Sequence, residues 1–242
     1  MAEKYQKRSL HPLTLTMNES VSIFRDLGFS VEIGPEIEDQ WHNFDALNFP
    51  KDHPARDMQD TFFVKDLVGP DSVPLVLRTH TSNVQIRYME KLTKSGGKPP
   101  LAIVVPGKVF RNEATDSGHE MQFYQIEGLM VGEDISVANM KGVLLEFFKR
   151  FFTGEKIDVR LRPSFFPFVE PGFEIDLKKG DSWFELLGAG MVHPKVLENC
   201  GIDSKKYQGF AFGVGLDRLA MMKYKILDIR LFYQGDLRFN QF

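Results

Sequence analysis

Cysteine is nearly missing from this chain. Of its 242 residues, only Cys200 is a cysteine. An internal disulfide is therefore excluded, and no CxxC pair is available for a zinc site. This composition rules out a small disulfide-stabilised secreted domain and predicts a protein of a reducing, cytoplasmic compartment.

Long apolar runs and an excess of positive charge are also missing. No apolar run approaches the roughly 20 residues that span a bilayer, and the opening MAEKYQKRSLHP contains no apolar stretch typical of a signal peptide. The formal net charge is −3, far from the basic balance of a protein that binds nucleic acid by itself. We therefore expect neither a membrane protein nor an exported one, and any RNA contact must be local or shared with a partner.

Apolar and aromatic residues, in contrast, are plentiful. They make up 43% and 12% of the chain, which is enough to fill a substantial buried core. No internal repeat, low-complexity tract or linker composition divides the sequence. We therefore predict one domain over residues 11–242, preceded by a frayed or disordered basic terminus over residues 1–10.

Hydrophobic spacing predicts both helices and strands. Apolar residues at three- and four-residue steps indicate helices over residues 13–27, 83–92, 137–152 and 216–224, with a short one near Val196. Short or alternating apolar runs indicate strands within residues 31–37, 101–110, 122–132, 157–162, 173–177, 183–187 and 209–213. Because strands outnumber crossover helices, the pattern favours the α+β class with a largely antiparallel sheet flanked by helices.

One predicted hairpin carries the residues with the clearest chemistry. The strand ending in FRNE and the strand QFYQIEG are separated by a short polar loop, which favours antiparallel pairing. Side chains two apart share a face, so Arg111 and Glu113 point one way while Phe123, Gln125 and Glu127 line one face of the second strand. This set suits a nucleotide beside an amino acid. A solvated strand face, salt-bridged across its own hairpin, would carry the same residue types.

A second segment, GFAFGVGLDR, places closely spaced glycines before a helix that carries Arg218 near its start. It is not a P-loop, because no GxxxxGK[ST] occurs in the chain. Nor is it a GxGxxG dinucleotide turn, because Arg218 stands where the last glycine would be. Glycines that only permit tight packing would give the same pattern.

Aromatic residues gather in a third segment. Four phenylalanines between residues 165 and 173 are interrupted by prolines, which is unusual in a regular core strand. They fit either a wall around a ring-shaped ligand or ordinary core packing. Among the histidines, His80 and His119 flank the polar segments and are the best candidates for chemistry.

Three segments, in this order, resemble the motifs of class II aminoacyl-tRNA synthetases. They are GFSVEIGPEIE at residues 28–38, FRNE at residues 110–113 and GFAFGVGLDRLAM at residues 209–221. The intervening LRTHTS, QIEG, FFPFVEPG and LLGAGMVHP, with the tail DIRLFYQGDLRFNQF, resemble the α subunits of bacterial-type phenylalanyl-tRNA synthetases. The resemblance covers nearly the whole chain and implies the class II synthetase-like version of the α+β fold.

The resemblance also implies an activity. A chain of this family activates L-phenylalanine with ATP to phenylalanyl-adenylate and transfers the acyl group to tRNA(Phe), with Mg²⁺ accompanying ATP and with a β subunit in an (αβ)2 assembly. Charge builds on the α-phosphate in the first step, so fixed cations are the main catalytic device and no protein nucleophile is needed. The sequence starts where the family's catalytic region starts, so we expect the tRNA-gripping arm to be absent and tRNA charging by this chain alone to be weak.

Residue by residue, the matching motifs imply two adjoining sites. For ATP they imply Arg111, Glu113, Phe123 and Arg218. For phenylalanine they imply His80, Ser82, Gln125, Glu127, Phe166, Phe168 and Ala211. Catalysis is implied for Arg111, His119 and Arg218, and Glu185 is implied as the Mg²⁺ ligand.

Two other classes of protein share much of this pattern. A regulatory paralogue of a synthetase would bind an amino acid or RNA without catalysis, but the presence of both Arg111 and Arg218 disfavours it. An amino acid ligase would share the activation step and pass the acyl group to an amine. Only the acceptor separates that ligase from a synthetase.

Specificity gives a first prediction. The Ala211 methyl group leaves little room for a tyrosine hydroxyl, and an apolar floor would leave that hydroxyl unpaired at a cost of roughly 1 to 3 kcal/mol. We expect Ala211→Gly to admit para-halogenated phenylalanines, measured as amino-acid-dependent exchange of pyrophosphate into ATP. Unchanged selectivity in this variant would remove Ala211 from the pocket.

Overall fold

The computed structural model describes residues 10–57, 59–69 and 72–236, so the expectation for the basic terminus lies outside it except at Leu10. Its centre is a seven-stranded sheet in the order β1-β5-β6-β10-β9-β8-β7. The strands are β1 (Ser30–Val31), β5 (Leu101–Phe110), β6 (Gln122–Gly132), β10 (Gln208–Gly215), β9 (Ser182–Val192), β8 (Val169–Lys179) and β7 (Ile157–Phe166). All neighbours pair antiparallel except β1 with β5. The predicted α+β class with a largely antiparallel sheet is confirmed.

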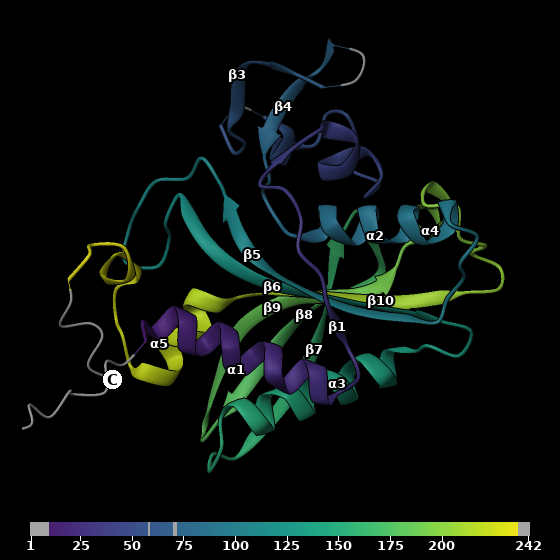
Figure 1. Ribbon diagram of the computed structural model, residues 1–242. Helices are drawn as coiled ribbons and strands as arrows, with labels where there is room; N and C mark the ends of the chain where they lie inside the picture. The colour runs from purple at the N-terminus through teal and green to yellow at the C-terminus, as the bar shows by residue number, and fades with distance from the viewer. Residues whose placement is uncertain (1–9, 58, 70–71, 237–242) are drawn as a thin grey trace, which may run out of the picture.

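Helices cover both faces of this sheet (Figure 1). On one face lie α1 (Pro12–Asp26) and α3 (Val137–Phe151), and on the other lie α2 (Ser82–Lys94) and the short α4 (Pro194–Asn199). The sequence sets the ends of these helices locally. Ser136 caps α3 through a capping box with Asn139, and α1 is followed by Gly28 at φ +90°, which favours glycine. No helix among the described residues is long and apolar enough to cross a membrane.

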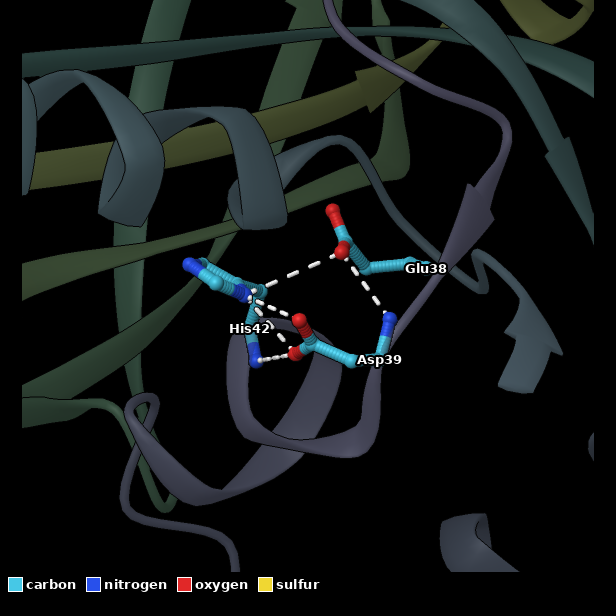
Figure 2. A group of neighbouring side chains, drawn as sticks. All are labelled: Glu38, Asp39 and His42. Carbon is cyan, nitrogen blue, oxygen red and sulfur yellow. Dashed lines mark hydrogen bonds and ion pairs between the residues drawn. The ribbon is translucent and has the colours of Figure 1, made fainter. Parts of the chain in front are cut away.

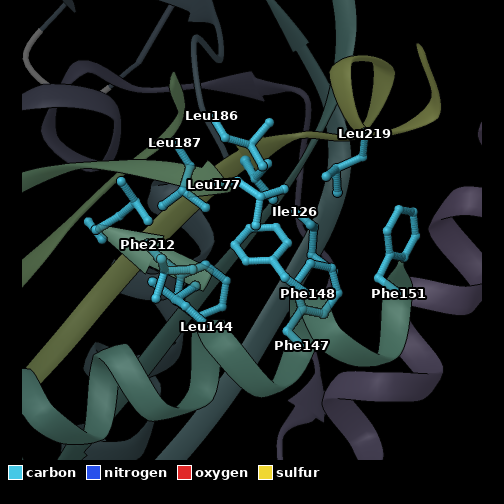
Figure 3. Close-up of a cluster of buried hydrophobic side chains, with 14 of the residues drawn as sticks. Ile126, Leu144, Phe147, Phe148, Phe151, Leu177, Leu186, Leu187, Phe212 and Leu219 are labelled. Atoms are coloured by element: carbon cyan, nitrogen blue, oxygen red, sulfur yellow. The ribbon is translucent and has the colours of Figure 1, made fainter. Parts of the chain in front are cut away.

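The main core lies between the sheet and the helices α1 and α3, and it is rich in phenylalanine (Figure 3). Phe24 of α1 stacks on Phe147 of α3 with ring centroids 4.4 Å apart, and also on Phe212 of β10 at 5.2 Å. A second apolar cluster lies on the opposite face of the sheet, beneath α2 and α4. Both faces of the central strands are therefore covered, as the apolar composition predicts.

A smaller sheet was not predicted from the sequence. It has the order β2-β4-β3, with β2 (Ile37–Glu38), β4 (Pro74–Leu77) and β3 (Phe63–Val68), and it projects from the main body (Figure 1). Its strands are short and largely exposed, so they leave little hydrophobic pattern to detect. Beside it, residues Trp41–Asp45 form a π-helical turn and Pro54–Arg56 a 3-10 turn.

The strands β7, β8 and β9 are longer than the sequence predicted. Pro163 lies inside β7, and Pro171, one of the two prolines that interrupt the phenylalanine segment in the sequence, lies inside β8. The sheet tolerates Pro163 because β7 is an edge strand, and Pro171 because the pairing of β8 with β9 shifts register between Val169 and Gly172. The hairpin of β7 and β8 therefore has Phe165, Phe166 and Phe168 at or beside its turn.

The phenylalanine core gives a stability prediction. We expect Phe147→Ala to lower the free energy of unfolding by about 3 to 5 kcal/mol, because Phe147 is almost fully buried and packs against three other helical phenylalanine rings. The measurement is the midpoint of urea unfolding at constant slope. As a control, Phe165→Ala removes a ring that is 83% exposed, and we expect a change within about 0.5 kcal/mol. Equal losses in the two variants would contradict the core described here.

Candidate active site

Two adjoining cavities lie on the face of the sheet that α2 and α4 cover. The inner pocket measures about 510 Å³ and the outer pocket about 410 Å³. Both pockets are lined by Arg111, Glu113, Gln125 and Phe166. Strand β6 positions three of the pocket residues directly. Its alternate side chains Gln125, Glu127 and Leu129 point to this face, while Tyr124, Ile126 and Met130 pack with the core.

A buried carboxylate forms the polar end of the inner pocket. Glu127 of β6 accepts a hydrogen bond from the Thr81 N–H at 3.0 Å, another from Gln85 Nε2 at 3.2 Å, and a third from the Ser82 hydroxyl. Burial raises the pKa of Glu127 to about 7, although these donors and the nearby Arg111 oppose the rise. Near neutral pH this carboxyl is therefore poised between its charged and neutral forms.

The loop before α2 supplies the next wall of the inner pocket. His80 is buried beside Arg111, and these two effects lower the pKa of His80 to about 3, so its ring is neutral. The His80 ring stacks on Phe49 with centroids 6.1 Å apart. Gln125 Oε1 is buried and has no hydrogen-bond partner within the described residues. An unpaired acceptor beside a carboxylate suits the ammonium group of a ligand.

Arg78 fixes this loop to two other segments. Its Nε donates to Lys108 O at 2.7 Å, and its Nη1 donates to Gly34 O at 3.1 Å and Pro35 O at 3.2 Å. A buried arginine that bonds three backbone carbonyls holds its surroundings rigidly. Sequence analysis missed Arg78, and its position one residue before the Thr79–Ser82 loop was the available signal.

The other end of the inner pocket is apolar. Phe166 and Phe168 lie with ring centroids 5.9 Å apart, and Phe168 packs on Phe49 at 5.6 Å. Ala211 of β10 stands opposite Leu129 of β6 in the register of the sheet, and both line the pocket. A cavity with one charged end and one apolar, aromatic end fits an amino acid with a ring-shaped side chain.

The outer pocket contains the remaining predicted residues. Arg111 lies over the Phe123 ring at 5.1 Å, donates from Nε to Thr79 O at 3.3 Å, and lies 4.0 Å from Glu113. Arg218, in the first turn of α5 (Leu216–Tyr224), is exposed and makes no hydrogen bond or ion pair with the part of the chain described here. An aromatic ring, a half-buried guanidinium and a free guanidinium suit a nucleoside phosphate.

His119 faces the outer pocket from the loop after β5. It is exposed, and its Nδ1 lies 3.0 Å from Asp116 Oδ1. The sequence suggested that Arg111 to Glu113 belong to the strand that ends in FRNE. In the structure β5 ends at Phe110, so these three residues follow the strand. Arg111 still pairs with the returning chain, through its N–H and Met121 O at 2.9 Å, which keeps it on the predicted face.

Two carboxylates at the edge of the outer pocket fit a Mg²⁺ ion. Glu185 and Glu174 both line the pocket, and Arg162 pairs with them at 2.6 Å and 3.0 Å. Mg²⁺ in nucleotide sites is held by one or two carboxylates together with phosphates. The predicted Glu185 therefore has a suitable neighbour in Glu174, which sequence analysis missed because the pairing of β8 with β9 brings them together.

A second acidic cluster lies away from both pockets (Figure 2). His42 Nδ1 lies 2.7 Å from Asp39 Oδ1 and 3.7 Å from Glu38 Oε1. Glu38, however, is fully engaged by the Arg87 guanidinium and by Asn83 Nδ2 at 2.8 Å. Because Glu38 is 1% exposed and both of its oxygens already accept hydrogen bonds, this cluster serves to attach the segment after β2 to α2.

The structure therefore brings every predicted site residue to one of the two pockets, although their roles stay predictions. The inner pocket alone contains His80, Ser82, Glu127, Phe168 and Ala211, the outer pocket alone contains Phe123, His119, Glu185 and Arg218, and both contain Arg111, Glu113, Gln125 and Phe166.

Comparison with known proteins places this site in a family. The family described as tRNA synthetases class II core domain (F) matches residues 1–242, and the chain belongs to it. A pyrrolysyl-tRNA synthetase from Desulfitobacterium hafniense has a similar fold, with a TM-score of 0.72 over 96% of this chain and 76% of that one at 17% identity.

Curated relatives narrow the family to one kind of subunit. The chain is 55% identical over 242 residues to the phenylalanine–tRNA ligase alpha subunit of Dehalococcoides mccartyi, with 95% of this chain and 68% of the relative covered. It is 50% identical over 239 residues to the same subunit of Rickettsia bellii, with 98% and 66% covered. The family predicted from the sequence is confirmed, and the chain spans about two thirds of the length of these relatives.

Glu127 gives a prediction for the pH dependence of stability. Because its folded-state pKa is raised from 4.5 to about 7, the native state holds a proton that the unfolded state has lost between these values. Stability from this group is full below pH 4.5 and is lost as pH rises through 7, by on the order of 3 kcal/mol.

The measurement is the free energy of unfolding from pH 4.5 to 8 for the wild type and for Glu127→Gln. We expect the variant to lack this part of the fall, because glutamine has no proton to lose. Glu133→Gln, at an exposed residue, is the control and should reproduce the wild-type curve. Parallel curves for all three proteins would show that Glu127 is ionised throughout.

Proposed function

We propose that this chain is the catalytic subunit of a phenylalanine–tRNA ligase, which activates L-phenylalanine with ATP and transfers the acyl group to tRNA(Phe). The observation that carries the proposal is the junction of the two pockets at Arg111. The inner pocket is charged at one end and aromatic at the other, and it meets a pocket bearing Phe123 and the free Arg218. An amino acid carboxylate and an α-phosphate would therefore meet beside the half-buried guanidinium of Arg111.

Phenylalanine binding would use the groups at the two ends of the inner pocket. The ammonium group would face Glu127 and Gln125, and the phenyl ring would lie against Phe166 and Phe168 above Ala211. A bound ammonium favours the carboxylate form of Glu127, whose pKa lies near 7, so binding releases part of a proton at neutral pH. His80, which is neutral, would donate a hydrogen bond without adding a charge.

ATP binding would use the outer pocket. Adenine would stack between Phe123 and Arg218, with its amine facing Glu113. Glu185 and Glu174 would hold Mg²⁺, which supplies charge neutralisation to the phosphates when it is bound. His119 would leave Asp116 to contact the distal phosphates.

The first chemical step is displacement at phosphorus. A carboxylate oxygen of phenylalanine attacks the α-phosphorus, the bond to the bridging oxygen breaks, and pyrophosphate leaves with that electron pair. Arg111 stabilises the negative charge that develops on the α-phosphate, because a half-buried, positioned guanidinium acts more strongly there than a cation in water. In the second step a ribose hydroxyl at the 3′ end of tRNA attacks the acyl carbon, and AMP leaves.

A β subunit in an (αβ)2 assembly and a cytoplasmic location complete the proposal. The proposal of a partner subunit is supported by the segment around β2, which exposes apolar side chains. Ile33 is 81% exposed, and Ile37 and Trp41 are also exposed, although less so. Contiguous exposed apolar groups are typical of interaction surfaces. The buried thiol of Cys200, which stays reduced in the cytoplasm, suits that location.

The activity test is exchange of pyrophosphate into ATP with each of the twenty amino acids, with and without the β subunit. We expect exchange with phenylalanine alone. Arg218→Ala should lower kcat/KM by about a hundredfold or more, because it removes the guanidinium that would cover adenine and contact the distal phosphates of ATP. Arg150→Ala, at an exposed arginine of α3 that pairs with Glu146, is the matched control and should stay within about twofold of wild type.

Two outcomes would redirect the proposal. A folded sample with the β subunit and no exchange would favour a non-catalytic paralogue. Exchange with phenylalanine but transfer to an amine instead of to tRNA would favour an amino acid ligase.

A further inference from the structure

A buried carboxylate that was not among the predicted site residues lines the outer pocket and connects two of its walls. Asp217, at the start of α5, is 1% exposed. Its Oδ2 accepts the Tyr124 N–H at 2.7 Å, and its Oδ1 accepts the Tyr233 hydroxyl at 2.5 Å. Tyr124 follows Phe123 in β6, and Arg218 follows Asp217 in α5. Asp217 therefore connects the residue after Phe123 to the residue before Arg218, and Phe123 and Arg218 are the two groups that would enclose adenine.

This bond continues a ladder that the backbone cannot extend. The pairing of β10 with β6 ends at Gly215 and Gln125, where the chain turns into α5. The next N–H along β6, that of Tyr124, would lose its partner there, and the Asp217 carboxylate supplies one. The orientation of α5 against β6 thus depends on a side chain at this point.

The chain after α5 contributes the second bond and a further contact. Residues Ile229–Phe232 form a 3-10 turn that ends at Tyr233. The Ile229 N–H donates to Ser117 O at 2.9 Å, in the loop that carries His119, and Ile229 lines the outer pocket. Figure 1 shows this turn beside that loop. The segment therefore contacts the pocket from two sides.

Asp217 has no other explanation in the described part of the chain. No lysine, arginine or histidine there forms an ion pair with it, and burial raises its pKa to about 6. Burying a carboxylate without a counter-charge is unfavourable unless it is fully hydrogen-bonded. Its position at the N-terminus of α5 offsets part of that cost.

We propose that Asp217 is a positioning residue that sets the separation of Phe123 and Arg218, and that Tyr233 completes it. The turn at residues 229–232 thereby contributes to the nucleotide site, because it positions Tyr233 to bond Asp217. This inference rests on the proposed function, since it assigns Phe123 and Arg218 to ATP. Asp217 itself need not touch ATP.

Three substitutions separate positioning from general stability. Asp217→Leu keeps the branching at Cγ and removes both bonds, and Tyr233→Phe removes only the hydroxyl. Asp217→Asn keeps both bonds, because its oxygen accepts from Tyr124 N–H and its amide donates to the Tyr233 oxygen. We expect the KM for ATP to rise about tenfold or more in D217L and about threefold in Y233F, and to stay within about twofold in D217N.

The readout that identifies positioning is the split between the two substrates. In the assembly in which the wild type is active, the KM for phenylalanine should stay within about twofold in all three variants. Tyr224→Phe is the matched control, since it removes a half-buried tyrosine hydroxyl at the far end of the same helix. That variant should leave the KM for ATP unchanged.

Contrary outcomes are distinct from failure of the proposed function. If the wild type shows no phenylalanine-dependent exchange, calorimetric titration with ATP alone replaces KM, and the same order of affinities is expected. Should D217L not fold, Y233F carries the test. Equal rises for both substrates, an unaffected Y233F, or a D217N as weak as D217L would overturn the proposal.

Discussion

The alternation of side chains along β6 is the constraint on which the rest of the structure depends. This strand lies between β5 and β10, so its backbone groups are paired on both sides and its register is fixed. Ile126 packs among the core phenylalanines on one face, and Glu127 enters the inner pocket on the other. A slip of one residue would exchange a buried apolar group for a carboxylate, which makes the position of the site inseparable from the stability of the core.

Burial of charge is the electrostatic cost of this arrangement. Glu127, Arg111 and His80 lie close together, and burial is the largest influence on the pKa of each one. Burial and the Arg111 guanidinium together keep His80 neutral, and the same guanidinium partly offsets the desolvation of Glu127. Groups with such opposed shifts cluster at functional sites because a ligand can supply the charges that the protein leaves uncompensated.

Sequence reasoning reached the fold and the site where local pattern decides the structure. The strand at residues 122–132 and the helix at residues 216–224 have the bounds that the spacing predicted. The shared face of Phe123, Gln125 and Glu127 followed from the period of a strand. The small sheet was missed because its strands are short and exposed. Glu174 and Asp217 were missed because the contacts that define them come from distant strands, which local sequence patterns do not reveal.

The central place of β10 has a consequence for synthesis of the chain. This strand comes late in the sequence yet lies between β6 and β9, which were made before it. Until residues 208–215 leave the ribosome, β6 and β9 each lack a neighbour and present unpaired edges, which are prone to pair with other chains. The nascent protein therefore has two unjoined halves of a sheet, and the pocket residues that the two halves carry cannot come together until β10 has been made.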